Sequence, residues 1–144
     1  MDYASVINSY IGTPWLKCGE TAKGVDCWGF LRLFFRQECG LALPGDYHAH
    51  LNPEGVSFNM GDKKRILDSF NTAAKSVTWT RIESPIDYSV VAMSSGRNIH
   101  HVGVWLGNGC IHAVQGVGVV YNTLNQLKRN SYNHLEFYTC KNLL

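Results

Sequence analysis

The sequence predicts a single α+β domain, in which N-terminal helices pack on a central antiparallel β-sheet. Two observations lead to this fold class. Up to about residue 75 apolar residues recur at helical spacing, and from residue 77 short β-rich segments alternate with turn residues. The length of 144 residues suits one compact domain spanning 1–144.

Three helices are expected in the first half of the chain. The first covers residues 2 to 11, with Asp2 as its N-cap and Gly12-Thr13-Pro14 at its end. A polar loop over residues 16 to 25 follows it. After the second helix, a long loop over residues 45 to 62 leads to a third helix over residues 63 to 75.

The second helix lies in the stretch GVDCWGFLRLFFRQECGLALP. Asp26 is the expected N-cap, and Gly40 is expected to stop the helix. One apolar stripe follows the helical spacing and begins at the first turn: Cys27, Phe30, Leu31, Phe34 and Phe35.

Six short strands are expected to form the antiparallel sheet. They are Val77 to Ile82, Tyr88 to Met93, Ile99 to Leu106, Cys110 to Val114, Gly118 to Tyr121 and Leu135 to Cys140.

Composition and charge exclude several classes of protein. Hydrophobic residues make up 45% and charged residues 17% of the chain, as in globular proteins. The net charge of +2 without a basic stripe argues against a nucleic-acid partner, and no apolar run is long enough for membrane insertion. The start MDYASVINSY has no signal-peptide pattern, so we expect synthesis in the bacterial cytoplasm. Any action of the protein outside the cell would then need a delivery route other than a signal peptide.

The five cysteines predict neither a disulfide framework nor a metal centre. Their number is odd, and no Cys-x-x-Cys pair occurs. The short pairs His48-x-His50 and Cys110-x-His112 could contribute ligands, but neither has a partner pair at a recognised separation. We therefore expect no metal and no cofactor.

Cys27 has a special place because a thiol in the first turn of a helix meets the positive end of the helix dipole. That field lowers the thiol pKa, and a nearby imidazole would lower it further through a thiolate–imidazolium pair. N–H groups of the first turn could hold an oxyanion. The alternative is that Cys27 is a small core residue, which is common for unpaired cysteines.

The stretch HHVGVWLGNGCIHAV supplies the imidazole. Gly107-Asn108-Gly109 indicates a hairpin turn, and a two-residue turn places His112 on the same face as His101. Gly103 has no side chain to separate the two rings. We expect His101 to act as a base and His112 to bind its second nitrogen, whereas His100 faces away; a three-residue loop would reverse this parity. The alternative is a core His101 beside a surface His112.

The segments GTPWLKCG, GVDCWGF, HHVGVWLGNG and CIHA together resemble the NlpC-type cell-wall peptidases, a papain-like cysteine peptidase family. The resemblance extends from about Ile11 to Tyr121 and implies a papain-like NlpC-type fold. It implies that Cys27 is the nucleophile, His101 the base and His112 the orienting residue of an endopeptidase. Its substrate would be the peptide stems of bacterial peptidoglycan, often cut between D-glutamate and diaminopimelate or lysine.

Other features of the resemblance concern the cleft and the setting of the activity. The residues expected to hold the oxyanion or substrate are Trp15, Asp26, Trp28 and Gly103. DCWGFLRLFFRQECGLALPGDY looks most like the phage tail-tip members, which implies a place in a virion tail, tail-tip proteins as partners and action at the host cell wall.

Two positions differ from the family pattern. Trp15 stands where tyrosine is usual, and an indole donates a hydrogen bond but does not accept one. Cys18-Gly19 or Gly19-Glu20 replaces the usual pair of glycines, which would narrow the cleft.

Two other functions fit the same residues. The first is an amidase or acyltransferase on this scaffold, since a triad fixes acyl transfer but not the acyl donor. The second is a non-catalytic tail-assembly plug, which exposed apolar patches around Trp15 and Trp28 would favour.

Overall fold

The computed structural model describes residues 2–43, 79–96 and 99–140. Two helices, α1 (Tyr3–Tyr10) and α2 (Cys27–Cys39), precede the sheet, and a short ribbon of β1 (Glu20–Thr21) and β2 (Gly24–Val25) lies between them in sequence. The predicted loop over residues 45–62 and the predicted third helix over residues 63–75 lie outside the described residues.

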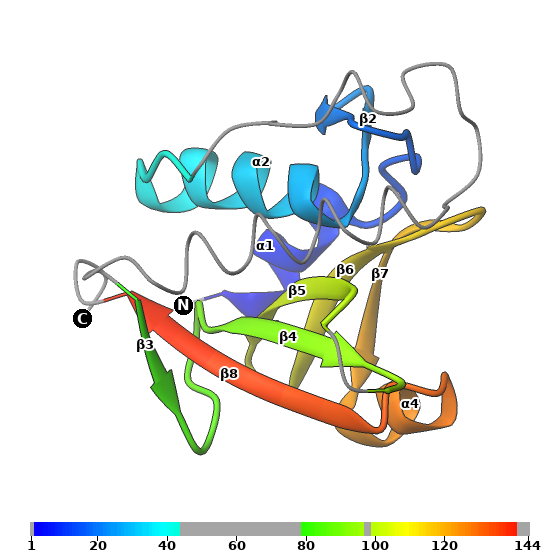
Figure 1. Cartoon of the computed structure of the whole chain (residues 1–144). Coiled ribbons are helices and arrows are strands. Elements are labelled where there is room, and N and C mark those ends of the chain that lie inside the picture. The colour runs from blue at the N-terminus through cyan, green and yellow to red at the C-terminus, as the bar shows by residue number, and fades with distance from the viewer. Residues whose placement is uncertain (1, 44–78, 97–98, 141–144) are drawn as a thin grey trace.

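A six-stranded antiparallel sheet forms the second half of the described chain (Figure 1). Its spatial order is β3-β8-β4-β5-β6-β7. The strands are β3 (Trp79–Ile82), β4 (Val90–Ser94), β5 (His101–Leu106), β6 (Gly109–Val114), β7 (Gly118–Thr123) and β8 (His134–Cys140), and α4 (Leu124–Arg129) connects the last two. The predicted α+β arrangement of N-terminal helices and an antiparallel sheet is confirmed.

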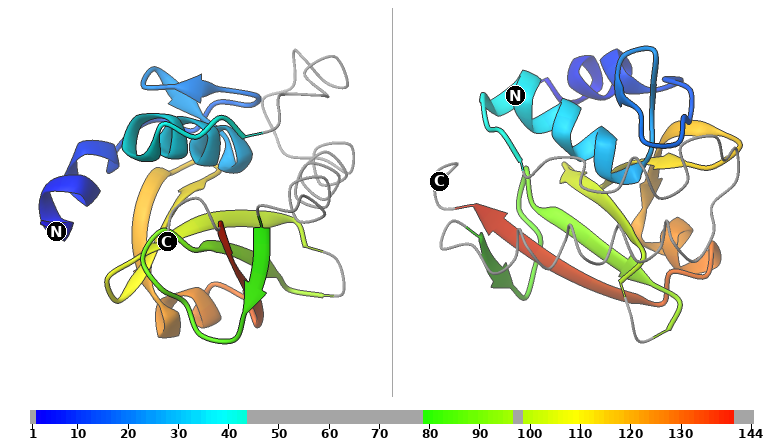
Figure 2. Two further views of the ribbon diagram at one scale, coloured as in Figure 1. Left: turned by 90° about the vertical axis from the view of Figure 1, so that its left-hand side faces the viewer. Right: turned by 45° about the horizontal axis from the view of Figure 1, so that its top comes forward.

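Each face of the sheet is covered by a different layer (Figures 1 and 2). Helix α2 packs on one face, where Val102, Val104 and Ile111 belong to the main core. The opposite face carries a smaller cluster that contains Met93, Trp105 and, from α4, Leu127. Alternation of side chains along β4, β5 and β6 therefore separates two apolar layers.

The expected helix signals act as predicted. Asp2 caps α1 by accepting a hydrogen bond from the N–H of Ser5. Asp26 caps α2 in the same way through the N–H of Gly29, and Gly40 ends α2 in the left-handed conformation with φ of 62°. These caps fix where α2 begins, and the position of Cys27 depends on that start.

The six strands were predicted with small errors at their ends, and three smaller elements, α4, β1 and β2, were missed. Tyr88 has a left-handed φ of 69°, so β4 begins two residues later than expected. The missed helix α4 has a capping box between Thr123 and Gln126, but its six residues are too few for a visible apolar period. The two-residue strands β1 and β2 lie within the predicted polar loop and are equally hard to recognise.

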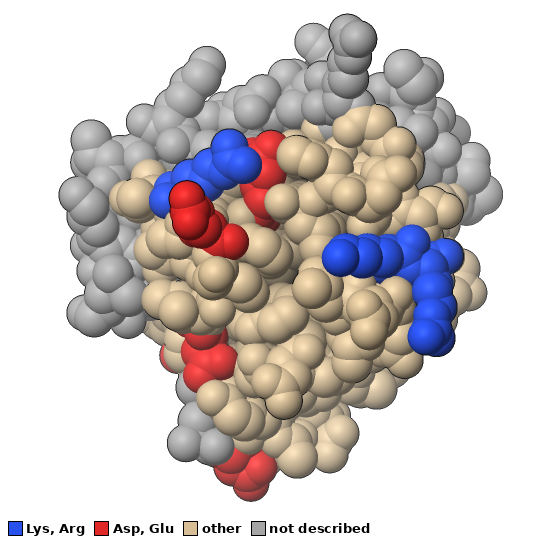
Figure 3. Space-filling model, turned by 90° about the horizontal axis from the view of Figure 1, so that it is seen from below, with Lys and Arg blue, Asp and Glu red and all other residues tan. Residues whose placement is uncertain are grey.

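The described surface carries its charges in separate groups. On the face that Figure 3 shows, the basic side chains do not merge into a stripe, and acidic groups lie among neutral ones. None of the described helices is both long and apolar enough to span a bilayer.

The start of α2 also depends on a very close approach between two glycines. A Cβ atom on Gly29 would lie 1.7 Å from the carbonyl oxygen of Gly19. The same oxygen accepts a hydrogen bond of 3.1 Å from the N–H of Asp26. The loop that contains Gly19 can therefore bind the helix start only because residue 29 has no side chain.

We predict that Gly29→Ala destabilises the fold although alanine is the better helix former by about 1 kcal/mol. The clash involves backbone on both sides, so relaxation must move the loop, and we expect the free energy of unfolding to fall by about 2 kcal/mol. Urea unfolding measures this change. Gly96→Ala is the control, because no heavy atom of the described residues lies within 4 Å of its Cβ position. Equal stability of both variants would contradict the close packing.

Candidate active site

A cavity of about 210 Å³ lies where the beginning of α2 meets one end of the sheet. Cys27 and Trp15 line it from the N-terminal segment, and His101 lines it from the first position of β5. The remaining lining residues are His100, Ala113, Val114, Gln115 and Tyr132. A thiol and an imidazole thus share one cavity although 74 positions separate them in the sequence (101 minus 27).

Cys27 is placed by the carboxylate of Asp26. One oxygen of Asp26 accepts from the N–H of Gly29 at 2.7 Å, and the other accepts from the N–H of Cys18 at 3.0 Å. Asp26 is 1% exposed and is not among the residues that line the cavity. Its carboxylate therefore holds the helix start, and the expected role of Asp26 in binding the oxyanion or the substrate stays a prediction.

Trp15 is held beside Cys27 by backbone pairing on both sides. The N–H of Val25 donates to the carbonyl of Pro14, and the N–H of Leu16 donates to the carbonyl of Val25. Trp15 itself forms an isolated parallel bridge with Val25. This pairing places the indole in the cavity wall, at the position where the family pattern has a phenol.

Cys18-Gly19 or Gly19-Glu20 takes the place of the usual glycine pair, and neither pair enters the cavity. Cys18 adopts a left-handed φ of 58°, a conformation that glycine favours. Its N–H bond to Asp26 offsets part of that strain. None of Cys18, Gly19 and Glu20 lines the cavity, so these side chains do not narrow it.

The two histidines are joined as the hairpin argument predicts. Leu106 pairs with Gly109 across a two-residue turn, and the register sets His112 opposite Gly103. His101 Nε2 lies 2.8 Å from His112 Nδ1. A hydrogen bond therefore links the two rings, and the predicted contact between them is confirmed.

Gly103 makes this approach possible. A Cβ atom at this position would lie 2.9 Å from Cβ of His112 and 2.5 Å from Sγ of Cys110. Gly103 lies inside the sheet and does not line the cavity. Gly103 therefore leaves room for the histidine pair, and its expected role in binding the oxyanion or the substrate stays a prediction.

Cys27 and His101 come from layers on opposite faces of the sheet. Cys27 belongs to the core cluster on the α2 face, whereas His101 pairs across β4 with Met93, which lies on the α4 face. They share a cavity because His101 is the first residue of β5 and Cys27 is the first residue of α2. The site thus lies at the end of the strands, where both faces are accessible.

Tyr132 covers the ring of His101. The two rings are stacked, with centroids 5.0 Å apart and an angle of 8° between their planes. Tyr132 lies just after Ser131, which has a left-handed φ of 75°, and its N–H donates to the carbonyl of Leu127. The chain reversal after α4 therefore turns Tyr132 back over the histidine.

Burial keeps the histidine pair neutral. It lowers the pKa of His101 well below its usual range, and the neighbouring rings of His112 and His100 lower it further. Burial also lowers the pKa of His112. The hydrogen bond to Asn122 raises that pKa, but by less than burial lowers it. These shifts disfavour the expected thiolate–imidazolium pair in the resting site, so His101 is placed to take a proton as the sulfur attacks.

Two other groups near the pair also stay protonated. Burial raises the pKa of Tyr132 to about 12, and burial raises the pKa of the Cys110 thiol. Cys110 is fully buried on the α4 face and does not line the cavity. It is therefore an inert thiol, in contrast to Cys27.

His100 is closer to the site than the sequence suggested. It precedes β5, so strand alternation does not govern its direction, and it lines the cavity. Its Nε2 accepts a hydrogen bond of 3.3 Å from the N–H of Ser95. The expectation that His100 faces away from the site is wrong, although this bond occupies one of its ring nitrogens.

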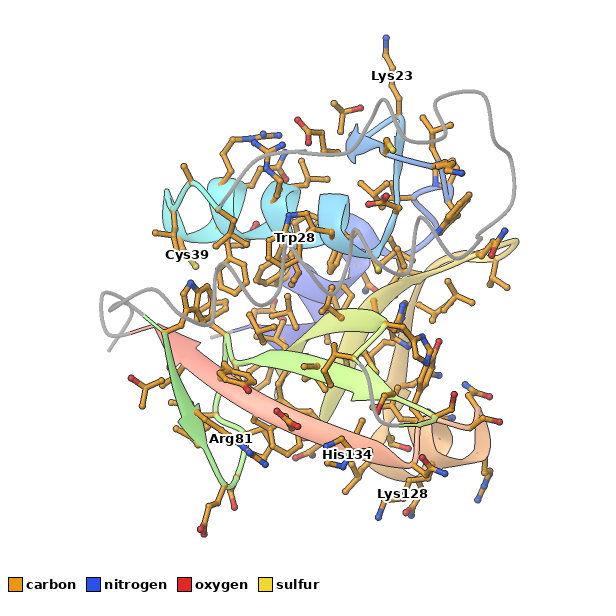
Figure 4. All side chains as sticks on the ribbon, in the orientation of Figure 1. Lys23, Trp28, Cys39, Arg81, Lys128 and His134 are labelled. Carbon is orange, nitrogen blue, oxygen red and sulfur yellow. The ribbon has the colours of Figure 1, made fainter. Side chains whose placement is uncertain are left out.

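Trp28 does not take part in the cavity. It is 1% exposed and belongs to the main core (Figure 4). The expected role of Trp28 in substrate binding is therefore not supported. Because Trp28 is buried, it cannot contribute to the exposed apolar patch that would favour a tail-assembly plug.

Two residues that contact the histidine pair were missed by sequence reasoning. Asn122 accepts a hydrogen bond of 2.8 Å from Nε2 of His112, and Tyr132 stacks on His101. Asn122 is diagonal to His112 across β6 and β7. This contact can be predicted only when the length of the turn after Val114 is known, because that length sets the register of β7. No sequence signal points to Tyr132.

In the described part of the chain, no three His, Cys, Asp or Glu side chains are grouped as metal ligands would be. Cys110 and His112 are neighbours along β6, but His112 uses both ring nitrogens in bonds to His101 and Asn122. Both ring nitrogens of His112 therefore belong to the hydrogen-bonded chain from His101 to Asn122.

Comparison with known proteins identifies the family that this chain resembles. The model of the NlpC/P60 family matches residues 12–135, which extends past the segment where the resemblance was recognised. The chain is 28% identical over 109 residues to the murein DD-endopeptidase MepS/murein LD-carboxypeptidase of Escherichia coli K12, covering 75% of this chain and 46% of that protein. It is 29% identical over 125 residues to a probable endopeptidase NlpC homolog of Haemophilus influenzae, covering 85% and 54%.

The fold is similar to that of the NlpC/p60 domain of the peptidoglycan hydrolase SagA. The TM-score is 0.59 at 20% identity, and the match covers 95% of this chain and 94% of that domain. The chain spans only about half the length of the curated relatives named above.

Proposed function

Since the chain belongs to the NlpC/P60 family, we propose that it is a cysteine-type endopeptidase that hydrolyses peptide bonds in bacterial peptidoglycan. The observation that carries this proposal is the shared cavity of Cys27 and His101, together with the hydrogen bond from His101 to His112. The names of the relatives, a murein endopeptidase among them, supply the substrate class.

The proposed reaction is acyl transfer to the sulfur of Cys27. The sulfur attacks the scissile carbonyl carbon while its proton passes to His101. The tetrahedral oxyanion, stabilised by the positive end of α2, collapses to a thioester as His101 protonates the leaving amine. Water then attacks the thioester carbon as His101 takes a proton from it. The second tetrahedral intermediate collapses with cleavage of the C–S bond, the carboxyl product leaves, and His101 returns that proton to the sulfur of Cys27.

The surroundings of the cavity suit an extended peptide. A second cavity of about 440 Å³ shares Trp15 and Gln115 with the first and is also lined by Pro14, Gly116 and Val117. Val117 is 68% exposed beside it. A branched stem peptide can therefore cross the indole of Trp15 from one cavity to the other.

We predict that the protein releases new amino termini from purified peptidoglycan and that Cys27→Ala lowers this activity about a thousandfold or more. Mass spectrometry of the soluble muropeptides identifies the bond that is cut. Cys39→Ala is the matched control, since Cys39 lies at the other end of α2 (Figure 4) and should remain active. Cleavage of amide or lipid donors without stem-peptide cleavage would instead support the amidase or acyltransferase alternative.

His112 should matter less than His101, because an orienting residue exchanges no proton with the substrate. We expect His112→Ala to lower kcat/KM about ten- to a hundredfold, and His101→Ala about a thousandfold or more. His112→Asn should retain part of the activity, since an amide oxygen can accept the N–H of His101. Steady-state rates on one muropeptide measure this order, and melting temperatures verify that the variants fold.

A wild-type rate for His112→Ala combined with a dead His100→Ala would contradict this assignment. His100 would then be the base, since it lines the same cavity.

We further propose that a phage tail delivers this activity to the host cell wall, with tail-tip proteins as partners. The support is the stretch from Asp26 to Tyr47, which looks most like tail-tip members of the family. The relatives named above are bacterial proteins and bear on the family alone. We predict that mass spectrometry detects the chain in purified tails, and detection only in the envelope of uninfected cells would contradict tail delivery.

A further inference from the structure

Asn122 ends a chain of hydrogen bonds that starts at the candidate base. His101 Nε2 and His112 Nδ1 are 2.8 Å apart, and His112 Nε2 and Asn122 Oδ1 are also 2.8 Å apart. Each bond needs one proton, and the two rings together with the amide oxygen decide where those protons lie.

The amide oxygen of Asn122 can only accept, so His112 must carry its proton on Nε2. A neutral imidazole has one N–H, which leaves Nδ1 of His112 as an acceptor. The proton between the rings must then belong to Nε2 of His101. Nδ1 of His101 is left with a free electron pair, and this is the atom that can take the proton of a thiol in the same cavity.

We propose that Asn122 is a positioning residue that sets the proton arrangement of both histidines and thereby makes Nδ1 of His101 the basic nitrogen. The inference rests on the proposed function for the roles of Cys27 and His101. It adds a fourth residue, which touches neither the substrate nor the sulfur.

The fold holds Asn122 from two sides. It pairs with Cys110 in the register of β6 and β7, which makes it a diagonal neighbour of His112 on the α4 face. The next residue, Thr123, is the N-cap of α4 and shares a capping box with Gln126. Sheet register and helix cap together fix the amide against the ring.

Without an acceptor at position 122, the proton arrangement has no preferred direction. His112 could then donate from Nδ1 to Nε2 of His101, and the proton of His101 would move to Nδ1. His101 would present an N–H to Cys27 in place of an electron pair. The direction of proton transfer therefore depends on the amide oxygen.

The groups around the pair do not set this direction themselves. Cys27 and His100 line the cavity, Tyr132 stacks on His101, and the sulfur of Cys110, on the neighbouring strand β6, lies beside Gly103. Among the described residues, no Asp or Glu contributes to the pKa shift of either ring. Asn122 is therefore the polar partner that acts on His112 from outside the pair.

The test uses the whole chain with ¹⁵N-labelled histidine rings, whose nitrogen shifts report which atom is protonated. Near pH 7.5 we expect both His101 and His112 of the wild type as Nε2–H tautomers. A wild-type His112 with its proton on Nδ1 would overturn the proposal directly.

Two variants distinguish a role of Asn122 in setting the histidine tautomers from a role in stabilising the fold alone. In Asn122→Asp the carboxylate keeps an acceptor for His112 but favours the imidazolium, so the tautomers should persist while the pKa of the pair rises by about one unit or more. In Asn122→Leu the Nε2–H preference of both rings should be lost. Alkylation of Cys27 by iodoacetamide at pH 7.5 should then slow about three- to tenfold, the worth of one hydrogen bond.

Asn125→Asp is the matched control, because it adds the same charge on the exposed first turn of α4. We expect it to leave the tautomers and the pKa of the pair unchanged. An equal rise of that pKa in both Asp variants, or wild-type tautomers in Asn122→Leu, would overturn the proposal. If Asn122→Leu does not fold, the nearly isosteric Asp variant decides alone.

Neither readout requires peptidoglycan. Failure of the wild type to cut stem peptides would therefore contradict the proposed function while the tautomers still test the role of Asn122.

Discussion

The site depends on one buried carboxylate. Asp26 binds the N–H groups of Gly29 and Cys18 with its two oxygens, and so joins the first turn of α2 to the preceding loop. A charge buried in this way is stable only when its hydrogen bonds are made, so both bonds are constrained together. The cysteine that follows Asp26 is therefore fixed relative to the loop and to Trp15.

The second constraint is the end of the sheet. α2 and the histidine pair lie on opposite faces, and a site in the middle of the strands would have kept them apart. Residues at a strand end can reach across the edge, and His101 occupies that position in β5. A cysteine from one face and a histidine from the other thus meet at the border between the two apolar layers.

The sequence predicted those parts of the fold and site that follow from short-range rules. Asp26 and Gly40 bound α2 because capping needs only local backbone geometry. The contact of His101 and His112 followed from a two-residue turn and strand alternation.

The parts that the sequence did not predict depend on loop geometry and on packing from several sides. Asn122 reaches His112 only through the particular turn between β6 and β7, and Tyr132 reaches His101 only because Ser131 adopts a left-handed φ. A serine in the sequence does not predict a left-handed φ. Trp28 lies outside the apolar stripe of α2 yet is buried, because α2 is covered on more than one side, including by the β1–β2 ribbon.

The stack of Tyr132 on His101 joins the base to a weak part of the molecule. α4 has six residues, and Leu127 is its one buried side chain. Short elements with few buried contacts open at a lower free-energy cost than the core does, and amide hydrogen exchange measures such opening. Each local opening of α4 would uncover the ring of His101 while the sheet and α2 remain intact. Heating should then expose the ring of His101 to solvent reversibly below the global melting temperature.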